Sequence, residues 1–325
     1  TGSAAIEAFK NKTNLNLFVL HPKGKISEFQ RKQMTTVKAD NIFNIAIKGN
    51  FDDCQRLVKS LFVDKKFNTT YNLASINSIN WARVLAQVVY YIYSTLKIVN
   101  STDDSSVDFI VPSGNFGDAY AGYIAKKIGF PIDKIYVATN SNDILKRFFE
   151  TGIYKKSEVI STLSPSMDIQ VASNFERLLY EIYSCDADRV LESMNHFSTK
   201  GYLRVEEKCI LNLRRTFKSF SVTDDEIIQI IKDINDKKNI ILDPHTAVGA
   251  KAFDFKKIEK KSKVLLATAH PIKFQDAVNK AMNGSYAIPD NFNLLLNSKE
   301  RLFTLENNIL VLKNFIRESL RSDDS

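Results

Sequence analysis

Residues 107–125 read VDFIVPSGNFGDAYAGYIA and carry the clearest indication of the fold. Val107 to Val111 is a mostly apolar run, which is typical of a buried strand. The proline and two glycines of Pro112 to Asp118 mark a tight turn. Small residues follow, so we expect a helix over 116–129 that packs closely on the strand. A buried strand, a glycine turn and a helix together predict a parallel sheet covered by helices.

The same alternation of strand and helix extends in both directions along the chain. Upstream we expect helices at 3–10, 27–35 and from Phe51, and strands at 15–21 and 42–47. Downstream we expect strands at 134–138, 239–242 and 264–268, and helices at 80–98, 143–151, 174–184 and 299–320. The pattern predicts an α/β protein of two three-layer αβα domains with mostly parallel sheets. We place a small domain at 1–79 and a large one at 80–325, with a helical insertion around 186–238.

The composition limits the possible partners. With 44% apolar residues, the 325-residue chain can bury a sizeable core, which excludes a disordered protein. The 45 basic and 37 acidic residues give a net charge of +8, which favours small anionic ligands. The basic run 256–263 lacks aromatic residues, so we expect no nucleic-acid partner. No apolar stretch could span a membrane and no secretory signal is visible, so we expect a soluble, cytoplasmic protein.

The glycine turn at Ser113 to Asp118 is also a candidate anion site. Glycines let backbone N–H groups converge, and the start of a helix carries a partial positive charge, so a phosphate can bind there. The same pattern also fits a tight turn that binds nothing. It is neither a Walker loop nor a dinucleotide fingerprint. Arg83, at the start of a helix, is either a phosphate or carboxylate ligand or a surface residue.

Two histidines lie beside prolines after predicted strands. They are His245 in DPHTA and His270 in TAHP. The carboxyl ends of parallel strands are where ligands bind, so each is either a site residue or a structural one. The histidines, cysteines and carboxylates show no metal-ligand spacing, so we expect no metal.

Nine segments in order along nearly the whole chain resemble those of one family. They are TGSAA from Thr1, HPKGKIS from His21, QMTT from Gln33, NSINWAR from Asn77, PSGNFGD from Pro112, VATNSNDIL from Val137, TLSPSMDIQVASNFERLL from Thr162, DPHTAVG from Asp243 and TAHPIKF from Thr268. Together they resemble threonine synthases of the long, yeast and enterobacterial type. The resemblance implies a pyridoxal-phosphate enzyme of fold type II, the tryptophan-synthase-β-like group.

The resemblance also implies roles for individual residues. The cofactor pyridoxal 5'-phosphate would be held by Thr268, at its pyridine nitrogen, and near its phosphate by Gly114, Asn115, Phe116, Gly117 and Asp118. The substrate would be contacted by Thr1, Ser3, Lys23, Asn77, Asn80 and Arg83. The family converts O-phospho-L-homoserine and water to L-threonine and phosphate, by γ-elimination followed by β-addition. A monomer is compatible with the long type.

One departure concerns the catalytic lysine. The family's Schiff-base lysine lies upstream of TGSAA, and Thr1 begins partway through the longer motif SGDTGSAA. We therefore expect an N-terminal segment to be missing, and this chain alone to contain no catalytic lysine and to be inactive. Two alternatives remain: a non-catalytic protein that binds phosphorylated metabolites, and another pyridoxal-phosphate lyase such as a serine or threonine dehydratase. Phosphate release from phosphohomoserine separates the synthase from the dehydratase.

Overall fold

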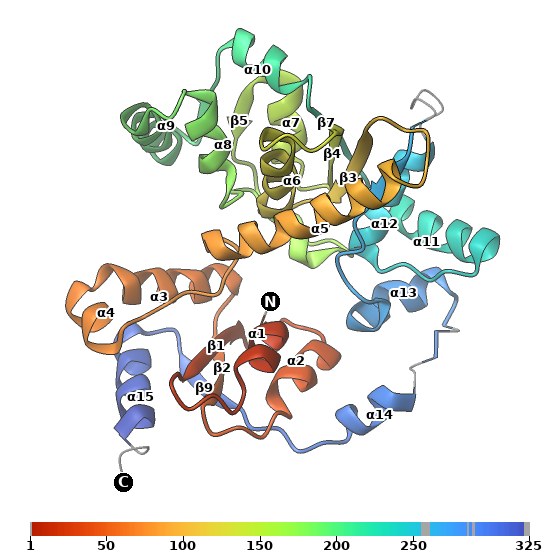
Figure 1. Cartoon of the computed structure of the whole chain (residues 1–325). Helices are drawn as coiled ribbons and strands as arrows, with labels where there is room; N and C mark the ends of the chain where they lie inside the picture. Colours follow the sequence, from red (N-terminus) through yellow and green to blue (C-terminus); the bar gives the residue numbers. More distant parts are fainter. Residues whose placement is uncertain (1, 255–260, 285, 288–289, 322–325) are drawn as a thin grey trace. The chain divides into compact units, whose positions relative to one another are not determined.

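The computed structural model describes residues 2–254, 261–284, 286–287 and 290–321, and it divides the chain into two compact units (Figure 1). Unit 1 comprises residues 1–77 and 287–325, and unit 2 comprises residues 78–286. The division between residues 77 and 78 lies close to residue 80, where the sequence analysis places the start of the large domain. The domain assignment of the last 39 residues differs from the prediction. They belong to unit 1 with the N-terminal part, whereas the sequence analysis places them in the large domain at 80–325.

Unit 1 is built on a three-stranded parallel sheet in the order β1-β2-β9. Its strands are β1 (Leu17–Pro22), β2 (Ile42–Lys48) and β9 (Phe303–Glu306). Alternate residues of β2 face opposite sides, so Ile42 packs with Met34 on one face while Ile45 packs with Leu57 on the other. The helices of unit 1 are α1 (Gly2–Phe9), α2 (Glu28–Thr35), α3 (Phe51–Val63), α4 (Lys65–Tyr71), α14 (Asp290–Leu296) and α15 (Ile309–Arg321).

Strand β9 explains why the C-terminal segment belongs to unit 1. Phe303 is in register with Ile45 of β2, which adds β9 to the edge of the sheet. The sequence predicts one helix over 299–320, but the structure has this short strand followed by α15. Four residues are too few to show a strand period, and their pairing partner lies more than 250 positions away, so no local pattern indicates the strand.

Unit 2 contains a four-stranded parallel sheet in the order β7-β4-β3-β8. Its strands are β3 (Val107–Pro112), β4 (Ile132–Thr139), β7 (Phe217–Ser221) and β8 (Lys263–Leu265). One face is covered by α5 (Trp81–Val99), α6 (Gly117–Lys127), α7 (Ile144–Thr151) and α8 (Phe175–Ile182). The other is covered by α11 (Asp224–Lys238), α12 (Pro244–Ala250) and α13 (Gln275–Ala281). Phe109 and Ile110 of β3 face opposite layers, so the strand is buried on both sides.

The remaining elements of unit 2 lie between or beside these layers. They are an antiparallel pair, β5 (Ile153–Lys155) and β6 (Tyr202–Arg204), the helices α9 (Ala187–Lys200) and α10 (Glu207–Leu213), and three 3₁₀ turns at Pro165–Met167, Lys251–Asp254 and Pro271–Phe274. The predicted helical insertion at 186–238 thus contains β7, which pairs with β4. The strand predicted at 239–242 is absent, because Asn239 ends α11 in the left-handed conformation and the chain then enters α12.

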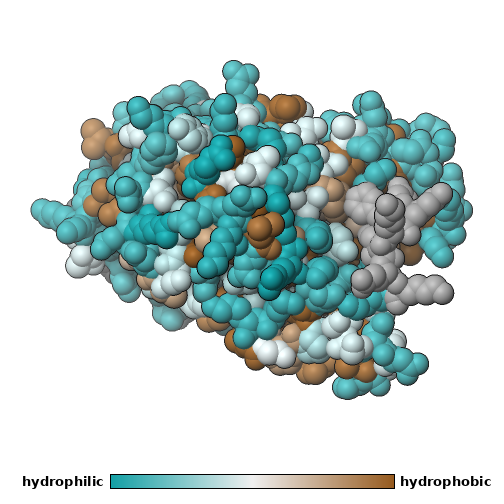
Figure 2. Space-filling model, turned by 90° about the horizontal axis from the view of Figure 1, so that it is seen from above, coloured by the Kyte–Doolittle hydropathy of each residue, from teal (hydrophilic) through white to brown (hydrophobic). Residues whose placement is uncertain are grey.

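No described helix is long and apolar enough to cross a bilayer. On the face drawn in Figure 2, hydrophilic residues cover most of the surface and apolar residues occur singly or in small groups.

Candidate functional site

The turn between β3 and α6 has an unusual backbone. The N–H of Ser113 still donates to Ala138 O at 2.8 Å, as a continuation of the sheet. Phe116 then adopts a left-handed conformation with φ of +62°, although it is not a glycine. Its ring is 1% exposed and lies 5.6 Å from that of Phe217, so core packing holds the residue in this conformation. Such strain persists where surrounding structure over-determines it, as at ligand sites.

This turn leaves polar groups without protein partners. None of the described residues accepts a hydrogen bond from the backbone N–H groups of residues 114–117. Helix α6 begins at Gly117 with no side-chain cap. The Ser113 hydroxyl is buried and also has no partner among the described residues. Buried polar groups are nearly always paired, and donors at the start of a helix can pair with an anion.

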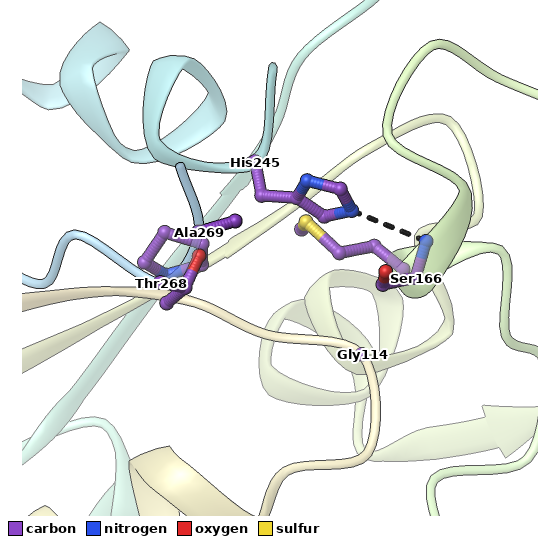
Figure 3. A pocket seen from close by; sticks show the side chains of 7 residues that line it. Gly114, Ser166, His245, Thr268 and Ala269 are labelled. Atoms are coloured by element: carbon purple, nitrogen blue, oxygen red, sulfur yellow. Dashed lines mark hydrogen bonds between the residues drawn. The ribbon is translucent and has the colours of Figure 1, made fainter. Parts of the chain in front are cut away.

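A first cavity, of about 150 Å³, lies at the carboxyl ends of β3 and β8 (Figure 3). Its lining residues are Pro112, Gly114, Ser166, Met167, His245, Thr268 and Ala269. The structure thus brings Gly114 and Thr268, which are 154 positions apart, to one cavity. A Cβ on Gly114 would lie 3.0 Å from Ile169 Cδ1 and 3.1 Å from Met167 Cα, so this position requires glycine for close approach.

A second cavity, of about 140 Å³, borders the same turn. It is lined by Ser78, Arg83, Gln87 and the whole of residues 112–118. Gly114 therefore borders both cavities. Burial lowers the pKa of the Arg83 guanidinium, and an anion in this cavity would stabilise its charged form. The second cavity consequently combines a cationic side chain with the start of α6.

Two predicted residues of the turn also bind other parts of unit 2. The Asp118 carboxylate accepts hydrogen bonds from the hydroxyls of Tyr90 at 2.5 Å and Tyr91 at 2.9 Å. Burial raises the pKa of Asp118. Asn115 Oδ1 accepts from the Ser173 hydroxyl at 3.1 Å, while its carbonyl accepts from the Asn174 N–H at 3.1 Å. Both side chains therefore hold the turn in place, and Asp118 joins α6 to α5.

The segment that packs against Gly114 is held by a polar network that the sequence did not identify. Asp168 accepts from Asn140 Nδ2 at 2.8 Å, from Asn142 Nδ2 at 3.1 Å and from the Thr162 hydroxyl at 2.6 Å. These bonds shape the 160–170 segment that carries Ser166. The residues belong to the matching motifs VATNSNDIL and TLSPSMDIQ, and that membership is the only signal that could have found them.

The residues predicted to contact substrate belong to both units. Of Asn80 and Arg83, both in unit 2, only Arg83 lines a cavity, because Asn80 caps α5 by accepting from Ala82 N–H at 2.9 Å. Three others belong to unit 1: Ser3 is half-buried in α1, Lys23 is exposed after β1, and Asn77 is the last residue of that part of unit 1. Thr1 lies outside the described residues.

Within the described parts of the chain, no three histidine, cysteine, aspartate or glutamate side chains form a group that could hold a metal ion.

Two family models match the chain. One, described as pyridoxal-phosphate dependent enzyme, matches residues 1–219. The other, described as threonine synthase, C-terminal, matches residues 246–316.

Individual relatives agree with these models. The threonine synthase of Pseudomonas aeruginosa is 43% identical over 320 residues, which cover 98% of this chain and 68% of that protein. The threonine synthase of Saccharomyces cerevisiae is 42% identical, with 98% and 67% covered. The crystal structure of pyridoxal-phosphate-bound threonine synthase from Brucella melitensis has a TM-score of 0.90 and 42% identity, with 98% and 68% covered.

Proposed function

The chain belongs to the threonine synthase family of pyridoxal-phosphate-dependent lyases, and we propose that unit 2 holds the cofactor between the 113–117 turn and Thr268. The N–H groups of residues 114–117 and the Ser113 hydroxyl, which have no partner among the described residues, are donors of the kind that a phosphate requires. The absence of a Cβ on Gly114 lets a ligand approach the backbone. The donor set therefore fits a phosphate ester.

In our proposal, the phosphate lies at the 113–117 turn and the pyridine nitrogen lies at the other end of the first cavity, beside Thr268. When bound, pyridoxal phosphate supplies an electron sink for carbanions of the substrate. Thr268 would donate its hydroxyl hydrogen to the pyridine nitrogen, and none of the described residues accepts a hydrogen bond from that hydroxyl. A neutral hydroxyl forms this bond without transferring its proton, so the nitrogen stays unprotonated. Thr268 would thereby orient the ring and fix its protonation state.

The 113–117 turn also lines the second cavity, and the part of this cavity beside Arg83 is our candidate for binding an anionic group of the substrate. We assign the phosphate or carboxylate of O-phospho-L-homoserine to Arg83, which borders this cavity beside the start of α6. A guanidinium can hold either group through two parallel hydrogen bonds. Ser3, Lys23, Asn77, Asn80 and Thr1 stay predicted substrate contacts. The reaction would release phosphate by γ-elimination and form L-threonine by β-addition of water.

The observation that carries the cofactor assignment is the turn that borders both cavities with unpaired donors. Isothermal titration of the chain with 4'-deoxypyridoxine 5'-phosphate tests it, because this analogue lacks the aldehyde and needs no lysine. We expect saturable binding that Gly114→Ala weakens roughly tenfold or more, since the added Cβ meets Ile169 and Met167.

Gly201→Ala is the matched control for that substitution. Gly201 has a φ of +77°, open space around it and no place in the lining of either cavity, so alanine there costs only roughly 1–2 kcal/mol of backbone strain. It should leave the affinity for the analogue unchanged. Equal affinities for Gly114→Ala and the unsubstituted chain would contradict the assignment of the turn.

The reaction itself is tested by phosphate release from O-phospho-L-homoserine with the complete gene product. We expect Arg83→Ala to raise KM or lower kcat, because it removes a charge-assisted hydrogen bond that contributes about 1.5–3 kcal/mol. Arg189→Ala is the control, because Arg189 is exposed on α9, pairs with Glu206 and lines neither cavity. Ammonia release from serine without phosphate release from phosphohomoserine would instead indicate a dehydratase.

We also propose that the protein acts in the cytoplasm as a monomer. Its three cysteines are free, as is usual for proteins of a reducing compartment. Light scattering after size exclusion tests the monomer, and a mass near twice the chain's value would contradict it.

A further inference from the structure

Asp243 lies at the start of α12 and connects two segments that line the first cavity. Its side chain is 1% exposed. One carboxylate oxygen accepts from His245 N–H at 2.9 Å and from His245 Nδ1 at 3.1 Å, and the other accepts from the Thr246 hydroxyl. Burial acts to raise the pKa of Asp243, but these hydrogen bonds outweigh it and the net pKa is lowered. The group is therefore an ionised acceptor.

The partners of His245 fix its tautomer. Nδ1 must donate, because the Asp243 carboxylate can only accept. Nε2 must accept, because its partner is the backbone N–H of Ser166 at 3.1 Å. The imidazole is thus neutral with its proton on Nδ1, and it joins α12 to a turn 79 positions earlier in the chain. Figure 3 shows this bond reaching from His245 to Ser166 across the edge of the cavity.

The same carboxylate reaches the other side of the cavity through Thr246. The Thr246 hydroxyl donates to Asp243 and accepts from the Thr268 N–H at 3.3 Å. In Figure 3, Thr268 and Ser166 lie on opposite sides with His245 between them. Two hydrogen-bonded connections therefore run from Asp243, one to each wall of the cavity.

A helix cap alone does not account for this arrangement. The cap of α12 consists of the bonds from the N–H groups of His245 and Thr246 to Asp243. The bonds from Ser166 to His245 and from Thr268 to Thr246 add nothing to that cap. They leave the helix and end on two residues that line the cavity, Ser166 and Thr268.

We infer that His245 is a positioning residue, which holds the Ser166 turn at a fixed distance from Thr268 so that the cofactor ring fits between them. The inference rests on the proposed function, because it assigns the ring to this cavity. Gly114 also constrains this turn, because a Cβ at position 114 would lie only 3.2 Å from the Ser166 carbonyl oxygen. His245 itself touches neither phosphate nor reacting atoms in this proposal.

Two substitutions separate the two bonds of His245. In His245→Gln, the amide reaches about as far as Nε2 of the histidine and can still accept from the Ser166 N–H. In His245→Asn, the amide reaches only as far as Nδ1, so it keeps the bond to Asp243 and loses the bond to Ser166. His196→Asn is the control, because His196 is exposed on α9 and packs on Tyr202. Each variant of the chain is examined by hydrogen exchange of a peptide over 163–170 and by titration with 4'-deoxypyridoxine 5'-phosphate and with inorganic phosphate.

We expect His245→Asn to speed exchange at Ser166 roughly tenfold and to weaken binding of the analogue by about as much. Inorganic phosphate should bind equally to all variants, because its donors lie in the 113–117 turn. His245→Gln should retain most of the protection and affinity. Equal exchange and equal affinity in His245→Asn and the unsubstituted chain would overturn the inference alone. Failure of the unsubstituted chain to bind the analogue would overturn the proposed function and, with it, the inference.

Discussion

The turns after β3 and β4 follow neighbouring strands at one edge of a sheet, but they differ in whether their polar groups are hydrogen-bonded within the protein. After β3, the N–H groups of residues 114–117 and the Ser113 hydroxyl have no partner among the described residues. After β4, Asn140 is fully buried and its amide donates to Thr162, Ser164 and Asp168. Buried donors cost free energy unless they are paired, so the two turns call for different explanations.

The difference separates a binding surface from its support. A network that satisfies its own members, such as that around Asn140, stabilises the fold without any ligand. The donors after β3 lie beside two cavities and, in our proposal, form hydrogen bonds only when an anion binds there. We expect substitutions after β4 to change the stability of unit 2, and substitutions after β3 to change ligand affinity.

The largest effect should come from Asn140→Ala. It removes the donor to Thr162 Oγ1 and Asp168 Oδ1, both at 2.8 Å, and the acceptor for Asn142 N–H at 2.9 Å. Each of these three groups would lose one hydrogen bond at once, and a cavity would remain at a fully buried position, so we expect the free energy of unfolding to fall by about 3 kcal/mol. Trp81, the chain's single tryptophan, lies in α5 and reports the unfolding of unit 2 in urea.

Asn195→Ala is the control for this measurement, because Asn195 is exposed on α9. It should change the free energy of unfolding by less than about 0.5 kcal/mol. A similar small change for Asn140→Ala would contradict the view that the turn after β4 supports the site.

Local sequence signals were sufficient for the turn after β3. An apolar strand, two glycines and a helix of small residues follow one another within 19 positions, so the strand, the turn and α6 could all be predicted. Resemblance added Thr268, which the fold brings to the cavity of Gly114. The sequence could not indicate that the N–H groups stay unpaired, because pairing depends on which distant segments approach them.

Long-range contacts account for what the sequence missed. Strands β7 and β9 have five and four residues and exist because β4 and β2 offer free edges. The bond from His245 to Ser166 spans 79 positions, and the bonds of Asp168 reach back to Asn140 across 28. Periodicity describes one element at a time, so it contains no information about such pairs.

The smallest effect, and the sharpest test of the comparison, concerns two buried serines. Ser113 is 4% exposed, and its hydroxyl has no partner in the part of the chain that the structure describes. The fully buried Ser164 hydroxyl, in contrast, accepts from Asn140 Nδ2 at 3.0 Å. Ser113→Ala deletes an unpaired polar group, so we expect the free energy of unfolding to stay equal or rise by up to about 1 kcal/mol. Its affinity for 4'-deoxypyridoxine 5'-phosphate should fall roughly fivefold, through the loss of one donor to the phosphate. Ser164→Ala should do the reverse, lowering stability by about 1 kcal/mol while binding the analogue as before. If both variants lost stability and neither lost affinity, the open donors after β3 would be a feature of the turn and not of a binding site.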